Sequence, residues 1–355
     1  MVDKKGGNIE VRSGNIAKAP KYILAVFCIA LGFLLGLGIG VKFLGGIQRG
    51  ECETKEFSQK KYKFISSFIN NEDRKILTNR DVTALKHRIE RFIDKKTEEG
   101  LITYTSVYYR DLLNGPSFGI NEKVKFTPAS LLKVPLMMAY LKFAEVEPQI
   151  LERKLQYKES IEPLTQYFES TDKVEIGEYY TIEDLIYRMI VYSDNDAKNL
   201  LLLHMIEPFF VKVYTDLDIP YPLADMNDNV MNIKDYASFF RILFNAAYLN
   251  REMSEKALSI LTKSKFKSGL IAGVPSGVVV AHKFGERINS ENYTRQLHDC
   301  GIVYHKDRPY LLSVMTEGRD FDELREVISE ISSIAYDAVN KSRPFFHLNS
   351  EQEKE

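Results

Sequence analysis

One Ser-x-x-Lys pair in this sequence stands where a serine could act as a nucleophile. Pro128 favours a helix start, and Ser130 and Lys133 follow one turn apart on the same helical face. Leucines lie between them and a long apolar stretch follows, so the lysine would lose hydration. A desolvated lysine has a lowered pKa and can accept the proton of the serine hydroxyl. The alternative is an ordinary helix-start serine beside a lysine that reaches the solvent.

The remaining nucleophile patterns lack this setting. Three other Ser-x-x-Lys pairs begin at Ser58, Ser170 and Ser264, and none of them precedes an apolar helix in the same way. A Gly-x-Ser-x-Gly pattern spans Gly115–Gly119, but a nucleophile elbow needs a helix immediately after the serine. A proline and a hairpin strand stand there instead, so we interpret this stretch as a turn.

Two further stretches could complete a catalytic site. Ser193, Asp194 and Asn195 interrupt an apolar helical run, where short polar residues usually cap a helix. The stretch GVVVAHKFG predicts a buried strand that presents Lys283 at its end.

In this order, FTPASLLKVP, YSDNDA and VAHKFG resemble the motifs of the penicillin-recognising serine hydrolases, most closely the class A β-lactamase catalytic domain. The resemblance runs from about Thr83 to Asn340. It implies that Ser130 is the acylated nucleophile and that Lys133 is its base or base partner. It also implies that Ser193 relays a proton to the leaving nitrogen and that Lys283 supplies positive potential. Asn195 would hold the acyl side chain of the substrate, and Phe284 and Gly285 would line the substrate site. The N–H groups of Ser130 and Glu286 would form the oxyanion hole.

A second lysine competes for the role of Lys283. Lys267–Gly269 reads Lys-Ser-Gly, which matches the family's lysine motif more strictly. This stretch follows a helix, however, whereas the motif must lie on the strand that walls the site. We therefore choose Lys283.

The sequence departs from the class A pattern at two places. The interval 211–237, which follows the Ser-Asp-Asn motif, contains no glutamate that could activate a deacylating water. Asp218, Asp225 and Asp228 lie there, and each is more typical of a loop cap than of a general base. Phe284 also replaces the hydroxyl residue that would bind the substrate carboxylate. Either Phe284 merely covers the site, or the site no longer selects a carboxylate there.

Two functions stay open at this point. The first is a serine acyl-enzyme hydrolase, acting as a weak β-lactamase or on D-Ala-D-Ala-type cell-wall peptides with slow deacylation. The second is a catalytically weak or inactive binding protein of the cell envelope with the same fold. No histidine spacing is typical of a zinc site, and we expect no metal or cofactor. The net charge of -1 argues against a nucleic-acid partner.

The order of elements predicts an α+β fold, an α/β sandwich in residues 79–345. Strands open and close this domain and a helical block lies between them. The resemblance implies an antiparallel five-stranded sheet, covered by the terminal helices, plus an all-helical subdomain. The polar residues 346–355 are expected to form a disordered tail.

The N-terminal part predicts a membrane anchor. Residues 22–45 include 20 uncharged residues, long enough for a bilayer core, and cations predominate before them. We expect residues 1–21 in the cytoplasm, a stem at 46–78 that partly docks on the domain, and an extracytoplasmic catalytic domain. Small-residue spacing at Gly32, Gly36 and Gly40 would allow a homodimer. Cys300 is expected to be a buried free thiol, although a disulfide with Cys52 stays open.

Overall fold

The computed structural model describes residues 62–66, 78–113, 115–160, 166–168, 172–205, 207–221, 230–289, 292–306 and 308–341. The expected anchor, its glycine seam, Cys52, most of the stem and the C-terminal tail lie outside these residues. In the part of the chain that the structure describes, no helix has the length and apolar character needed to cross a membrane.

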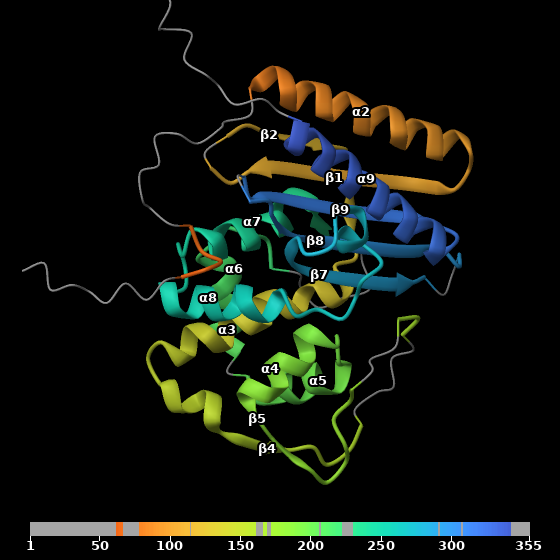
Figure 1. Cartoon of the computed structure of the whole chain (residues 1–355). Helices are drawn as coiled ribbons and strands as arrows, with labels where there is room; N and C mark the ends of the chain where they lie inside the picture. The colour runs from red at the N-terminus through yellow and green to blue at the C-terminus, as the bar shows by residue number, and fades with distance from the viewer. Residues whose placement is uncertain are drawn as a thin grey trace, which may run out of the picture. The chain divides into compact units, whose positions relative to one another are not determined.

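A five-stranded sheet forms one half of the fold, and every neighbouring pair of strands is antiparallel (Figure 1). The strand order is β2-β1-β9-β8-β7, so β7 is an edge strand. This confirms the predicted α+β class and the antiparallel five-stranded sheet. The strands are β1 (Ile102–Asp111), β2 (Ser117–Ile120), β7 (Val279–Ile288), β8 (Arg295–Tyr304) and β9 (Tyr310–Gly318).

Two terminal helices, α2 (Asn79–Glu98) and α9 (Phe321–Lys341), lie side by side over one face of this sheet (Figure 1). Thr78 caps α2 reciprocally with Asp81, which satisfies backbone N–H groups at the helix start. The buried residues of α2 form its apolar face: Val82, Leu85, Ile89 and Ile93.

Helices cover the other face of the sheet and form the second half of the fold (Figure 1). Thr181 caps α4 and Asn232 caps α7, and each side chain accepts a hydrogen bond from the backbone N–H three residues further on. Short strand pairs, β3 with β6 and β4 with β5, interrupt the helical block that the sequence predicts. The elements are β3 (Lys125–Phe126), η1 (Ala129–Leu132), α3 (Lys133–Ala144), η2 (Pro148–Glu152), β4 (Lys154–Gln156), β5 (Tyr179–Thr181), α4 (Ile182–Val191), α5 (Asn195–Leu203), α6 (Glu207–Thr215), β6 (Met231–Asn232), α7 (Ile233–Phe244), α8 (Arg251–Leu261) and η3 (Leu270–Gly273).

Residues 62–66 are the only described residues of the predicted stem before Thr78, and they contact the domain. The Glu255 carboxylate accepts hydrogen bonds from the N–H groups of Lys63, Phe64 and Ile65 at 2.7 to 3.1 Å. Phe64 and Ile65 are buried in the main core cluster. This short segment therefore belongs to the folded domain.

Candidate active site

Ser130 lies in the short 3-10 helix η1, and Lys133 is the first residue of α3. The predicted helix start is right, but its first turn is tighter than an α-helix. Ala129, directly before the serine, has a φ of 48°, which is uncommon for a residue with a side chain. Such strained positions persist only where the surroundings hold them, and they cluster at functional sites.

The η1 turn is held against the sheet by several contacts. Thr127 donates its N–H to Gln296 Oε1 at 3.1 Å, and its carbonyl bonds to His298 Nε2 at 3.0 Å. A Cβ atom at Gly285 would lie only 3.1 Å from Pro128 O and 3.2 Å from Leu131 N. Glycine at this place in β7 therefore lets the strand approach the turn that carries Ser130.

Two buried lysines converge on Ser193. Lys133 Nζ lies 2.6 Å from Ser193 O, 3.1 Å from Ser193 Oγ and 2.7 Å from Asn195 Oδ1. Lys283 Nζ lies 3.0 Å from the same hydroxyl oxygen and 2.7 Å from Phe284 O. Among the described residues, no hydrogen bond joins Lys133 to Ser130. Ser193 itself has a φ of 57°, a second strained residue at the site.

Burial shifts the charge state of both lysines. Desolvation lowers the pKa of Lys133 well below its usual value, and the positive charges of Lys283 and Lys198 lower it further. Desolvation also lowers the pKa of Lys283 to about 7, against the opposing effect of the Asp299 and Glu286 carboxylates. Lys133, whose pKa is lowered well below its usual value, is therefore the lysine that can act as a neutral amine, whereas Lys283 changes between its charged and neutral forms near neutral pH.

A neutral Lys133 would make Ser193 part of a proton chain. A neutral amine has two hydrogens and one lone pair, and Ser193 O and Asn195 Oδ1 accept the two hydrogens. The lone pair then faces Ser193 Oγ, whose hydroxyl can donate to it while Lys283 donates to the same oxygen. This geometry can move a proton between Lys133 and a group bound near Ser193.

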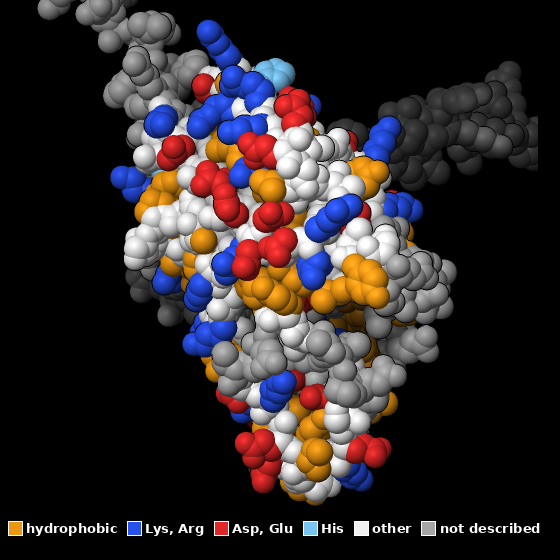
Figure 2. Space-filling model, turned by 90° about the vertical axis from the view of Figure 1, so that its right-hand side faces the viewer, with side chains coloured by type: hydrophobic (Ala, Val, Ile, Leu, Met, Phe, Trp, Pro, Cys, Tyr) orange, Lys and Arg blue, Asp and Glu red, His pale blue; other side chains and the backbone are white. Residues whose placement is uncertain are grey.

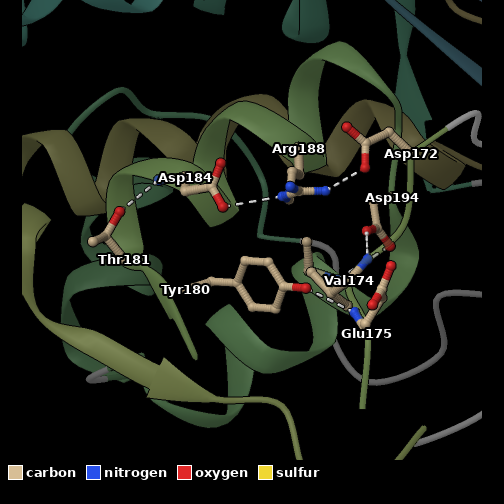
Figure 3. Close-up of polar contacts among 9 residues, drawn as sticks. Asp172, Val174, Glu175, Tyr180, Thr181, Asp184, Arg188 and Asp194 are labelled. Carbon is tan, nitrogen blue, oxygen red and sulfur yellow. Dashed lines mark hydrogen bonds and ion pairs between the residues drawn. The ribbon is translucent and has the colours of Figure 1, made fainter. Parts of the chain in front are cut away.

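Asp194 fixes the turn that presents Ser193 and Asn195. Its buried carboxylate accepts hydrogen bonds from the N–H groups of Asp196 at 2.8 Å and Ala197 at 3.3 Å, which makes it the N-cap of α5. It also accepts from Val174 N at 3.0 Å, in the segment that precedes β5 (Figure 3). The capping role expected from the sequence is present, and burial raises the pKa of this carboxyl.

Phe284 is buried, with 5% of its surface exposed. Its ring stacks on Phe266 at 4.2 Å between centroids and contacts Phe168 edge-on at 6.0 Å. Lys283 Nζ lies 4.2 Å from the centroid of the Phe284 ring, so strand alternation does not keep the ammonium away from the ring. Phe284 thus packs inside the protein beside the cation.

The other candidates lie apart from this cluster. Lys267 follows α8 and donates to Ser264 O at 2.6 Å, in a turn rather than on a strand. Asp218 is exposed just after α6, and Asp216 in the same interval pairs with Lys212 at 2.7 Å. Asp225 and Asp228 lie outside the described residues. Cys300 is a buried free thiol, as expected.

Sequence reasoning missed the side chain of Glu286. It assigned only the N–H group of this residue, but the carboxylate accepts the N–H groups of Tyr167 and Phe168, each at 3.1 Å. Burial raises the pKa of Glu286. Its charge also reaches Lys133 and Lys283, whose pKa values it raises. No local pattern signals a contact between segments 118 and 119 positions apart.

The fold and the lysine-serine cluster define a β-lactamase-like serine hydrolase domain, and the comparisons with known proteins agree. The model of the β-lactamase enzyme family matches residues 84–339, most of the chain, so the chain belongs to this family. No curated protein matches the sequence significantly.

Solved structures share this fold at low sequence identity. The extended-spectrum β-lactamase TLA-1 has 17% identity and a TM-score of 0.64, covering 74% of this chain and 100% of its own. A class A β-lactamase from Bacteroides cellulosilyticus has 19% identity and a TM-score of 0.62, covering 72% of this chain and 98% of its own. A PBP-A mutant, solved as an acyl-enzyme complex with penicillin G, has 21% identity and a TM-score of 0.61, covering 73% of this chain and 97% of its own.

Proposed function

We propose that the domain is a serine acyl-transfer hydrolase that forms an acyl-enzyme on Ser130 with β-lactams or D-Ala-D-Ala-type cell-wall peptides. The observation that carries this proposal is the convergence of two buried lysines on Ser193 Oγ, at 3.1 and 3.0 Å. One of these lysines has a strongly lowered pKa, as a general base must have near neutral pH. Membership of the β-lactamase enzyme family supports the same chemistry.

The reaction assigns one role to each group. Ser130 Oγ attacks the carbonyl carbon while its proton passes to Lys133, and the N–H groups of Ser130 and Glu286 hold the oxyanion. Ser193 then returns a proton to the leaving nitrogen, with Lys283 holding its oxygen. Asn195 holds the acyl side chain of the substrate. For the first step, Lys133 Nζ must approach Ser130 Oγ, since catalytic hydrogen bonds often tighten only in the substrate complex.

Deacylation is the slow step in this proposal. No described residue of the interval after α6 offers a carboxylate that contacts Ser130 or Lys133. The acyl-enzyme should therefore persist, so the protein would bind β-lactams covalently more readily than it destroys them.

A fluorescent penicillin tests the proposal directly. Wild-type protein should be labelled covalently, Ser130→Ala should not be labelled, and Lys133→Ala should be labelled about 10²- to 10⁴-fold more slowly. Labelling that survives Ser130→Ala would refute the assignment. No labelling of any variant would favour the alternative, a non-catalytic binding protein with this fold.

We also propose that residues 22–45 anchor the chain in the membrane with residues 1–21 in the cytoplasm. The support is the uncharged stretch and the excess of cations before it. A topology reporter fused after Glu355 should be active only outside the cytoplasm. If the anchor dimerises through Gly32, Gly36 and Gly40, replacing them with leucine should weaken crosslinking between chains.

A further inference from the structure

A three-residue segment, Gln166–Phe168, links the helical half of the domain to the edge of the sheet. We call these three residues the strap. Gln166 Nε2 donates to Ser193 O at 3.2 Å, on the helical side. The consecutive N–H groups of Tyr167 and Phe168 both donate to the Glu286 carboxylate of β7. The strap is therefore fixed at one end to the lysine-serine cluster and at the other to the edge strand.

Aromatic contacts add to the sheet-side attachment. The Phe168 ring lies 5.1 Å from the Phe266 ring and 5.8 Å from the Phe321 ring, in addition to its contact with Phe284. The Tyr167 ring packs on Phe321 at 4.7 Å, although Tyr167 is 51% exposed. Figure 2 shows the face at which β7 ends, where hydrophobic side chains gather across the middle below a group of acidic and basic ones.

The strap shares its attachment points with the candidate site. Ser193 O accepts a hydrogen bond from Lys133 as well as from Gln166. Glu286 lies two residues beyond Phe284, and the charge of its carboxylate acts on both Lys133 and Lys283. A substrate that reaches Ser130 along β7 would therefore meet the strap.

The segment after the strap is fastened to the helical half independently of β7 (Figure 3). Arg188 on α4 pairs with Asp172 at 2.6 Å, and Val174 N donates to the buried Asp194 carboxylate. Glu175 N donates to Tyr180 Oη at 2.9 Å. The strap can therefore lose its contacts to Glu286 and to the aromatic rings around Phe284 while the segment after it stays attached to the helical half.

We propose that the strap is an autoinhibitory cover: it bridges Ser193 O and the Glu286 carboxylate, and an extended peptide ligand must displace it to reach Ser130 along β7. Because β7 is an edge strand, it can pair with an added extended segment. Pairing of this kind uses the backbone groups of β7, and displacement of the strap would free the Glu286 carboxylate from the N–H groups of Tyr167 and Phe168. Only the identity of this ligand rests on the proposed function; the closed position of the strap does not.

Tryptophan fluorescence can test whether Glu286 holds the strap closed, because the chain contains no tryptophan of its own. Tyr167→Trp places a single reporter on the strap against Phe321, at a position with room for a larger ring. Acrylamide quenching is then compared between this parent, its Glu286→Gln derivative and its Glu175→Gln derivative. Glu175 is the matched control, since it is exposed in the same connection and its carboxylate makes no described contact with the strap.

Glu286→Gln should raise the quenching constant about two-fold or more, because local opening costs less once the carboxylate is lost. Glu175→Gln should match the parent. An unchanged constant in a Glu286→Gln protein with native circular dichroism overturns the proposal. If that protein does not fold, Phe168→Ser removes the ring contacts from the strap without altering β7, and an unchanged constant there overturns the proposal equally.

The quenching measurement is separate from acylation, so the two proposals can fail separately. Labelling of Ser130 by a fluorescent penicillin, together with an unchanged quenching constant, would overturn the strap and leave the proposed function standing. A raised constant without labelling would support the strap and count against acylation by β-lactams.

Discussion

Raising the pH through about 7 is expected to slow the acylation of Ser130, because Lys283 loses its charge there. Burial lowers the pKa of this lysine from its ordinary value of 10.5, so the ammonium is charged below about pH 7 and neutral above it. The charged form donates to Ser193 Oγ at 3.0 Å and offers positive potential to a substrate carboxylate. The neutral amine of Lys283 donates a weaker hydrogen bond to Ser193 Oγ and offers no positive charge to the substrate.

The size of the effect follows from these contacts. One pH unit above the pKa, about one tenth of the molecules retain the charge, so the rate should fall about ten-fold per unit. A hydrogen bond to a charged group contributes about 1.5–3 kcal/mol, so the total loss should level off at roughly 10- to 150-fold. At acidic pH the rate should fall for the opposite reason, because Lys133 becomes protonated and can no longer accept the serine proton.

The assay is the second-order rate of labelling by one fluorescent penicillin, measured from about pH 5 to pH 9 on both sides of this pKa. Lys283→Arg is the control, since a guanidinium stays charged throughout this range and should remove the alkaline decline. A flat alkaline limb in the wild type, or the same limb in a folded Lys283→Arg protein, would refute the role given to the Lys283 charge.

Three further outcomes are expected. Phe284→Thr should speed penicillin acylation about ten-fold, because it places a hydroxyl beside Lys283. The loss of the ring should also lower the free energy of unfolding, measured by urea titration, by about 2–4 kcal/mol. An unchanged acylation rate in the folded variant would mean that Phe284 does not limit recognition of the penicillin. Asp194→Ala should lower the free energy of unfolding by about 2–4 kcal/mol, because three N–H groups lose their acceptor, and Asp194→Asn should recover part of it; equal stability of the wild type and Asp194→Ala would contradict the anchoring role. Steady-state hydrolysis of a penicillin should be slow after an initial burst, and fast turnover without a burst would reveal a deacylating base, with Asp218, Asp225 and Asp228 the first residues to replace.

Much of the fold could be predicted because its signals are local. The strands that open and close the domain, the helix start after Pro128 and the helix cap at Asp194 each depend on neighbours within a few positions. The choice of Lys283 over Lys267 also rested on local context, since only Lys283 follows a buried strand pattern. The 3-10 turn at Ser130 was not predictable, because contacts from β7 and β8 impose it.

The contacts that distinguish this site depend on residues far apart in the sequence. The sequence shows only that Phe284 replaces a hydroxyl residue of the family. The structure shows in addition that its ring stacks on Phe266 and lies beside Lys283 Nζ. From the sequence, Glu286 would be taken for an exposed charged residue. In the structure its carboxylate accepts hydrogen bonds from backbone N–H groups of the segment before β5. A one-dimensional pattern carries no information about which backbone groups meet such a carboxylate.

The location of a covalent penicillin adduct tests the central claim most directly. Wild-type protein is incubated with a penicillin, digested, and the modified peptide is identified by mass spectrometry. The account predicts a single modified residue, Ser130, and an unmodified peptide in Ser130→Ala. An adduct on any other residue, or no adduct on a folded protein at saturating penicillin, would contradict it.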